Sequence, residues 1–117
     1  MIRIKLNDFF DKPLLTGFGD YVVIEKLRNR YNIDYSLDEI EIQVDKPIFS
    51  IHEDFFINLL RIRSIEYPSI EEFKNSVSIN AINNIAIEKS FNIAIKKLIK
   101  ARKQFDLSLP KEKCINE

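Results

Sequence analysis

The chain has 117 residues, of which 45% are hydrophobic and 31% charged, and it contains a single cysteine, Cys114. This size and composition are typical of one globular domain that buries a core without disulfides or structural metals. One unpaired thiol excludes a disulfide framework and fits a reducing compartment. The start of the chain lacks the apolar region of a signal peptide, and no apolar run is long enough for a membrane span. We therefore expect a cytoplasmic protein.

Charge is balanced overall but unevenly distributed along the chain. There are 18 basic and 18 acidic residues, and this balance disfavours a dedicated nucleic-acid-binding protein. Residues 34–54 contain seven acids and one base, whereas residues 88–103 contain six bases and one acid. Two interpretations stay open. The uneven charge orients a charged partner, or the two segments pair with each other within the fold.

The first half of the chain predicts two strands with a helix between them. Residues 2–6 and 39–44 alternate apolar and polar side chains, as strands with one buried face do. Between them, Asp20 is expected to cap a helix that ends at about residue 31. The positions of this helix that face the core are predicted to be Val23, Leu27 and Tyr31.

The next helix is predicted from a capping box. Ser50 is placed as the N-cap because Glu53 follows it by three residues. The helix over residues 51–62 is apolar around most of its circumference. It should therefore be sandwiched between other elements or covered by a partner.

The last third of the chain predicts a short helix, a short strand and a long helix. Ser69 and Glu72 form a second capping box, which opens a helix to about residue 74, and a strand follows at 77–79. The long helix covers about 84–105. Its predicted apolar seam is Ile87, Phe91, Ala94, Leu98, Ala101 and Phe105, and its outward lysines are Lys89, Lys96, Lys100 and Lys103.

This order of elements predicts an α/β fold with a small mixed or mostly parallel sheet covered by helices. Residues 1–106 are expected to form the single domain and 107–117 a polar C-terminal tail. Strands 2–6 and 39–44 should lie inside the sheet. The last helix should pack on it through Phe91, Leu98 and Phe105. Whether residues 8–19 or 63–66 contain further strands is left undecided by the sequence.

Groups that could perform catalysis are scarce. His52 is the single histidine, and no nucleophile motif accompanies it. His52, Glu53 and Asp54 are consecutive, and neighbouring residues of a helix point about 100° apart, so they do not converge on a metal ion. We expect no enzymatic activity, no cofactor and no metal.

Two features invite an anion-binding interpretation that the residues do not favour. The segment 16–20 has glycines at 17 and 19, but it lacks the further residues of a dinucleotide or P-loop motif, and Asp20 would repel an anion. A plain turn is the better interpretation. The lysines of the last helix lack the interleaved aromatic residues that single-strand binders use. We expect a solvated face and no nucleic-acid binding at physiological ionic strength.

One stretch resembles part of a known family: Val44-Asp45-Lys46-Pro47-Ile48-Phe49-Ser50-Ile51-His52-Glu53-Asp54-Phe55-Phe56. It is similar to the STAS-like domains of bacterial proteins related to anti-sigma-factor antagonists. In that family a strand ends in an Asp-containing loop, and a serine turn opens a helix reading roughly Ser-Ser-Phe-Leu-Asp-Glu-Leu. Residues 4–10 with Pro13 look like the family's opening, and the layout of 67–102 is similar. The resemblance implies a STAS-like fold and a regulator that binds proteins, often a histidine-kinase-like ATPase or an anti-sigma factor.

The resemblance also directs attention to the start of the second helix. Phospho-regulated members carry their switch serine there, and alignment through Asp45 puts that place on Glu53 or Asp54, so a phosphorylatable serine is not expected. Glu53 either mimics the phosphorylated state or only completes the capping box, and we favour the cap. The expected partner-binding residues lie on this helix and the loop before it: Ser50, His52, Glu53, Asp54, Ile57, Asn58 and Arg61.

Three functions follow from these observations. The leading one is a non-enzymatic protein–protein interaction module of a regulatory kind. The first alternative is a small phage or mobile-element inhibitor, whose acidic region 34–54 occupies a basic site on a host protein. The second is a nucleic-acid accessory protein that uses the basic C-terminal helix.

Overall fold

The computed structural model describes residues 1–16 and 20–108 and confirms the α/β class. The predicted turn at residues 17–19 and residues 109–117 of the predicted tail, with Cys114, lie outside the described part. The elements in chain order are β1 (Ile2–Lys5), the 3₁₀ helix η1 (Leu6–Asp8), β2 (Leu14–Leu15), α1 (Tyr21–Tyr31), β3 (Ile40–Val44), β4 (Ser50–Ile51), α2 (Glu53–Glu66), α3 (Ile70–Asn75), β5 (Val77–Ala81) and α4 (Ile85–Ser108).

The main sheet has three parallel strands in the order β1–β3–β5. Ile40 of β3 lies level with Ile2 on one side and Val77 on the other. The prediction that residues 2–6 lie inside the sheet is wrong, because both helical crossovers add the next strand on the same side and leave β1 at the edge. A second, two-stranded parallel sheet joins β2 to β4. The sequence left undecided whether residues 63–66 form a strand. In the structure they belong to α2.

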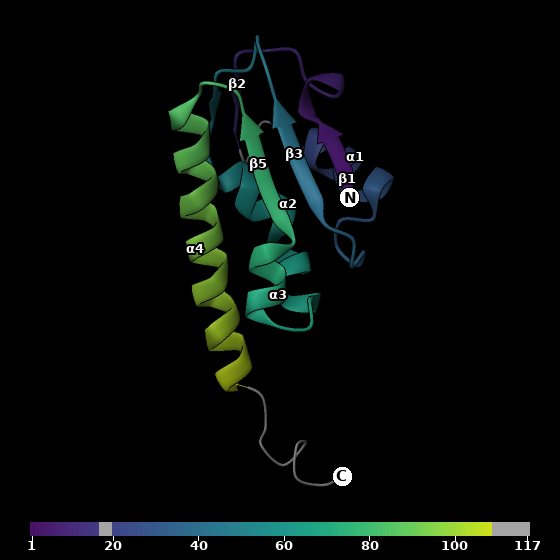
Figure 1. Ribbon diagram of the computed structural model, residues 1–117, viewed down its shortest axis with the longest axis vertical. Coiled ribbons are helices and arrows are strands. Elements are labelled where there is room, and N and C mark those ends of the chain that lie inside the picture. The colour runs from purple at the N-terminus through teal and green to yellow at the C-terminus, as the bar shows by residue number, and fades with distance from the viewer. Residues whose placement is uncertain (17–19, 109–117) are drawn as a thin grey trace, which may run out of the picture.

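The helices cover one face of the main sheet. In Figure 1, α1 and α2 lie behind the strands and α4 runs beside β5. Alternation along each strand turns apolar side chains, such as the buried Ile4 and Ile42, toward these helices. The uncovered face is polar, as contact with water requires, although parallel sheets are usually covered on both faces. It carries Arg3, Lys5, Glu41, Gln43, Ser78 and Asn80.

Helix α2 occupies the centre of the molecule, where α1, α4 and the sheet surround it. Its residues Phe55, Phe56, Leu59 and Leu60 are all buried. The ring of Phe56 meets that of Phe91 on α4 edge to face, with centroids 5.4 Å apart. The prediction that this helix is sandwiched is confirmed.

Helix α4 follows the predicted seam for only part of its length. Phe91 and Leu98 are buried as expected, but Phe105 is 40% exposed and Ala101 is also exposed. The packing prediction for Phe105 is wrong because the last turns of α4 extend beyond α3, where no other helix or strand of the described residues covers them (Figure 1). The helix continues to Ser108, so residues 107 and 108 are helical and do not belong to a tail.

The other helix starts differ in how well their caps were predicted. At α3 the prediction is confirmed: the Ser69 hydroxyl accepts from the backbone N–H of Glu72 at 3.1 Å and donates to its carboxylate at 2.9 Å. At α1 the predicted position is confirmed, since Asp20 is the N-cap residue and the helix ends at Tyr31, but the Asp20 side chain makes no cap bond. Its carboxylate accepts instead from the backbone N–H of Thr16, at 2.6 Å. In α1 the fully buried residues are Ile24 and Leu27, whereas Val23 and Tyr31 are partly buried.

A buried arginine, Arg63 of α2, holds the connection between α1 and β3. Its guanidinium donates to the backbone carbonyls of Ile33 at 3.1 Å, Ser36 at 2.7 Å and Asp38 at 2.5 Å. It also lies 4.7 Å from the centroid of the Tyr67 ring. Burial lowers the pKa of Arg63, yet an arginine stays charged in proteins.

A second buried arginine, Arg102 of α4, completes the carboxyl end of α2. Its Nη1 donates to the carbonyls of Ser64 and Tyr67, each at 2.8 Å. Its Nε donates to Asp106 at 2.9 Å. The last carbonyls of a helix lack partners within the helix and attract a cation, so Arg102 satisfies α2 from another element.

Candidate functional site

The candidate site lies where the parallel strands end. The carboxyl ends of β1, β3 and β5 all lie at the upper edge of the sheet in Figure 1. In open α/β sheets, this is the edge at which ligands and partners are usually bound. Three connections meet there: residues 6–13, 45–49 and 82–84.

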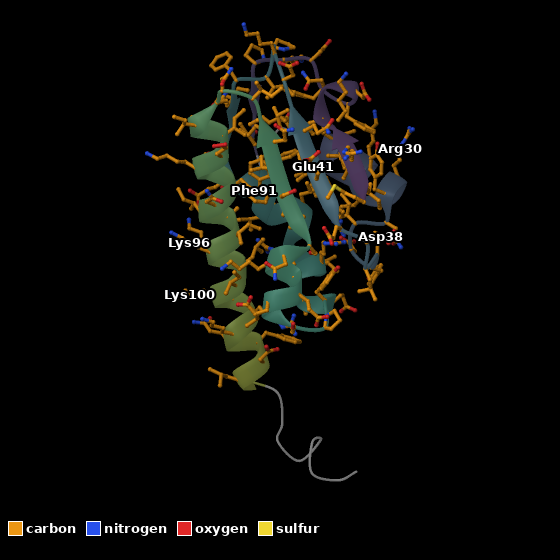
Figure 2. All side chains as sticks on the ribbon, viewed as in Figure 1. Arg30, Asp38, Glu41, Phe91, Lys96 and Lys100 are labelled. Atoms are coloured by element: carbon orange, nitrogen blue, oxygen red, sulfur yellow. The ribbon has the colours of Figure 1, made fainter. Side chains whose placement is uncertain are left out.

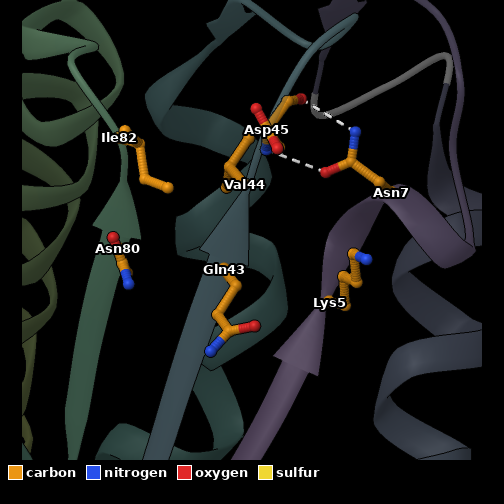
Figure 3. Close-up of a pocket in the computed structure, with 7 residues that line it drawn as sticks. All are labelled: Lys5, Asn7, Gln43, Val44, Asp45, Asn80 and Ile82. Carbon is orange, nitrogen blue, oxygen red and sulfur yellow. Dashed lines mark hydrogen bonds between the residues drawn. The ribbon is translucent and has the colours of Figure 1, made fainter.

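The side chain of Asn7 holds the loop 45–49 in place. Its amide oxygen accepts from the backbone N–H of Asp45 at 2.8 Å. Its amide nitrogen donates to the carbonyls of Asp45 at 2.8 Å and Lys46 at 2.9 Å. Figure 3 shows the contact between Asn7 and Asp45. The Asn7 side chain thereby hydrogen-bonds the backbone directly after β3, as a neighbouring strand does within a sheet.

The far end of the same loop is held by Pro13, from the same connection as Asn7, and by Asn84, from the connection 82–84. The backbone N–H of Phe49 donates to the carbonyl of Pro13 at 3.0 Å. The side chain of Asn84 donates to the carbonyl of Phe49 at 2.8 Å. Because two other connections fix this loop through three residues, little conformational entropy remains to be lost when a partner binds it.

Two adjoining recesses open beside the loop, and both include Val44, Asp45 and Ile82. The first measures about 220 Å³ and the second about 290 Å³. In the first, the polar groups do not converge: Figure 3 shows Lys5, Gln43 and Asn80 spread over the open sheet face, with Asn7 and Asp45 at the rim. Both volumes fall below the usual range of about 300–1,000 Å³ for small-molecule pockets, so a surface contact fits this edge better.

Two exposed apolar side chains, Phe49 and Ile82, line the second recess, and a third, Ile85, directly follows its lining residue Asn84 in the chain. Phe49 is 61% exposed, Ile82 65% and Ile85 71%. We call Phe49, Ile82 and Ile85 the carboxyl-edge patch. Phe49 and Ile82 both line the second recess, with the charged Asp45 and Lys46 beside them. Scattered exposed apolar residues are common, but a group of them around a recess with a polar rim is typical of an interaction surface.

The structure places the predicted site residue Ser50 in a strand and not at a helix cap. Ser50 belongs to β4, level with Leu14, and its N–H donates to the carbonyl of Pro13. The N-cap of α2 is His52, whose Nδ1 accepts from the backbone N–H of Asp54 at 3.1 Å. The Ser50 capping box is therefore wrong, because pairing with β2 keeps residues 50 and 51 extended and delays the helix.

Glu53 has a different partner from the one predicted. Its carboxylate forms an ion pair with Lys97 of α4, which raises the pKa of the Lys97 amine. The favoured capping role of Glu53 is therefore wrong, and its role as a phosphate mimic stays a prediction. The pair joins the acidic segment 34–54 to the basic segment 88–103. It is the kind of internal pairing that the charge distribution left open.

The remaining predicted contact residues follow α2 away from the sheet edge. Asp54 is close to His52, with 3.5 Å between the His52 Nδ1 and the carboxylate. Asn58 is partly buried and Arg61 exposed, and the helical period puts them one and two turns beyond Asp54. Ile57 is partly buried against the core.

The predicted contact surface on α2 needs a correction. The apolar residues that surround most of this helix are buried inside the molecule and are not free for a partner. They are Phe55, Phe56, Leu59 and Leu60. They are core residues because α2 has neighbours on several sides.

Sequence reasoning missed the carboxyl-edge patch and the role of Asn7. The position of Phe49, two residues after Pro47 in the loop that follows β3, was a usable signal for an exposed loop residue. Ile82 and Ile85 flank two asparagines, Asn83 and Asn84, which is typical of a turn. The contact from Asn7 to Asp45 spans 38 positions and has no local signal.

Over residues 1–16 and 20–108, no group of three or more His, Cys, Asp or Glu side chains is placed to hold a metal ion. Within the same part of the chain, no helix combines the length and apolarity of a membrane span. Compared with protein-family models, curated proteins and solved structures, the chain shows no significant match. Its resemblance to STAS-like domains stays a prediction.

Proposed function

We propose that this protein is a non-enzymatic protein–protein interaction module that binds its partner through the carboxyl-edge patch and the loop 45–49. The observation that carries the proposal is the exposure of Phe49 and Ile82 in a recess beside the loop 45–49, with the exposed Ile85 directly after its lining residue Asn84. The backbone of this loop is held by two other connections. Such a preformed apolar recess suits an apolar or aromatic side chain of a partner, the kind of anchor that dominates protein interfaces.

The charged residues at the rim of the recess would orient the partner. Asp45 and Lys46 are exposed beside the recess, and His52 and Asp54 are at the start of α2. Polar groups at the rim of an apolar centre select the partner and its orientation more than they add affinity. The expected contact residues His52 and Asp54 thus keep a place in the proposal, whereas Asn58 and Arg61 are peripheral to it.

The resemblance to STAS-like domains supports the same conclusion from the sequence. It covers the loop 45–49 and the start of α2, which adjoin the patch, and it implies a cytoplasmic regulator whose partner is a histidine-kinase-like ATPase or a similar protein. The inhibitor alternative needs a free acidic segment 34–54. Its support is reduced because Asp34 pairs with Arg28 at 2.8 Å and Glu53 pairs with Lys97.

The test is an affinity capture from an extract of the source cells, followed by mass spectrometry, with three versions of the protein. These are the wild type, Phe49→Ser in the patch, and Val22→Ser on α1. The Val22 side chain is 62% exposed, and Val22 is 27 positions away from Phe49 in the sequence. We expect at least one protein that the wild type and Val22→Ser retain and Phe49→Ser loses. If every captured protein is retained equally by all three, the patch is not the interface.

Once a partner is identified, two further variants define the edge of the contact. Asp54→Ala removes a rim charge, and Glu53→Gln removes the charge that pairs with Lys97. We expect Asp54→Ala to weaken binding by less than Phe49→Ser does, because rim residues contribute little affinity. A larger loss with Glu53→Gln than with Phe49→Ser would place the interface on α2, as the sequence suggested.

A further inference from the structure

Helix α4 carries a regular second stripe on the side away from the core. It consists of Lys89, Ile93, Lys96, Lys100, Lys103 and Leu107, all exposed. We call these residues the lysine stripe. Figure 2 shows Lys96 and Lys100 on the outer side of α4, opposite to Phe91, which faces the rest of the molecule.

The stripe's charge is not used within the fold. The ion pairs of α4 in the described residues join Lys97 to Glu53 and Arg102 to Asp106, and none includes a lysine of the stripe. No acidic residue occurs between Glu88 and Asp106. Lys96, Lys100 and Lys103 are spaced by four and three residues, and like charges at this spacing destabilise a helix slightly. Neither helix stability nor packing explains the stripe.

The spacing of the stripe corresponds to the seam of a helix pair. Its residues are separated by four, three, four, three and four positions, which is a heptad period of 3.5 residues. A side-chain row with this period stays aligned with a second helix when the two helices supercoil around each other. The exposed Ile93 and Leu107 place an aliphatic side chain within the stripe and another at its far end, with fractional exposures of 42% and 85%.

We propose that the lysine stripe binds an acidic amphipathic helix of a partner protein. Heptad-spaced glutamates of that helix would pair with the lysines, and its aliphatic residues would contact Ile93 and Leu107. Two copies of this chain do not pair stripe to stripe, because two lysine stripes repel each other. The binding surface is separate from the carboxyl-edge patch, so the inference does not depend on the proposed function.

A protein helix fits the stripe better than nucleic acid does. Phosphates gain nothing from Ile93 or Leu107, and the stripe has no aromatic side chain on which a base could stack. The zero net charge of the chain also provides no long-range attraction for a polyanion.

The experiment measures the binding of a fluorescently labelled synthetic helix by anisotropy at physiological ionic strength. The probe carries glutamates and leucines at heptad spacing, and its comparison is a peptide of the same composition in scrambled order. The test variant is Lys96→Glu with Lys100→Glu. The matched control is Lys26→Glu with Lys74→Glu, which makes the same change in net charge at exposed lysines of α1 and α3. Thermal melts confirm that both variants are folded.

We expect the heptad peptide to bind the wild type and the control equally. The test variant should bind it about tenfold more weakly, because two attractive pairs become repulsive. Equal binding of the scrambled peptide would show unspecific charge attraction and overturn the proposal. A short DNA duplex serves as the third probe. If it binds the wild type more tightly than the heptad peptide does, and loses binding with the test variant, the stripe is a nucleic-acid surface instead.

Discussion

Two regions of this protein reverse the usual distribution of polar and apolar side chains. In the interior, Arg63 has no exposed surface and Arg102 retains only 9% exposure. At the carboxyl edge of the sheet, Phe49, Ile82 and Ile85 are all more than half exposed. The reversal has a different meaning in each region. The arginines bind backbone carbonyls of the same chain, whereas nothing in residues 1–16 and 20–108 covers the apolar side chains.

This difference separates structure from function. A buried cation is tolerated when carbonyl groups that would otherwise lack partners surround it. Its removal lowers stability because those carbonyls lose their hydrogen-bond donor. An exposed aromatic side chain costs folding stability little and gains value only when another molecule covers it. Stability and binding should therefore respond in opposite ways to changes in the two regions.

The largest effect is expected from Arg63→Met. The methionine fills part of the volume, but the carbonyls of Ile33, Ser36 and Asp38 lose their donor. We expect the free energy of unfolding to fall by about 3–5 kcal/mol, measured by urea denaturation. Arg61→Met on the exposed side of the same helix is the control and should change it by less than about 0.5 kcal/mol. A similar loss in both variants would contradict the structural role of Arg63.

A smaller loss is expected from Arg102→Met. Its carbonyl partners at Ser64 and Tyr67 lose a donor, but Arg102 is less enclosed than Arg63, since it keeps 9% exposure and its partner Asp106 is 42% exposed. We expect unfolding to become easier by about 2–3 kcal/mol. Hydrogen exchange should accelerate mainly in the last turn of α2. Unchanged exchange there would show that Arg102 does not hold that end of the helix.

The smallest change in stability is expected from Phe49→Ala in the patch, and Phe91→Ala in the core is the comparison. Phe91 is 5% exposed and contacts Phe56, so Phe91→Ala should lower the free energy of unfolding by about 3–5 kcal/mol. Phe49 is 61% exposed, and Phe49→Ala should change it by less than about 0.5 kcal/mol. Denaturation curves of the two variants give the comparison. A large loss with Phe49→Ala would make Phe49 a core residue and remove the basis of the proposed interface.

The accuracy of the sequence prediction depends on how far apart in the chain the interacting groups are. The capping box of Ser69 and Glu72 was correct because its groups are three residues apart. The one at Ser50 and Glu53 had the same pattern and was wrong, because β2 pairs with residues 50 and 51 and Lys97 binds Glu53. Equal local signals led to different structures once distant segments intervened.

The amino-acid sequence by itself determined the α/β class, the strands around residues 40 and 77 and the inner seam of α4 as far as Leu98. These depend on side-chain periodicity, which local geometry translates directly into a buried face. Only the tertiary structure decided that Arg63 and Arg102 are buried and that Phe49, Ile82 and Ile85 are not. The partner of Arg102 at Ser64 is 38 positions away, and no segment at any distance covers the patch within the described residues. The burial of these five side chains depends on which remote groups surround them, and that information exists only in the folded chain.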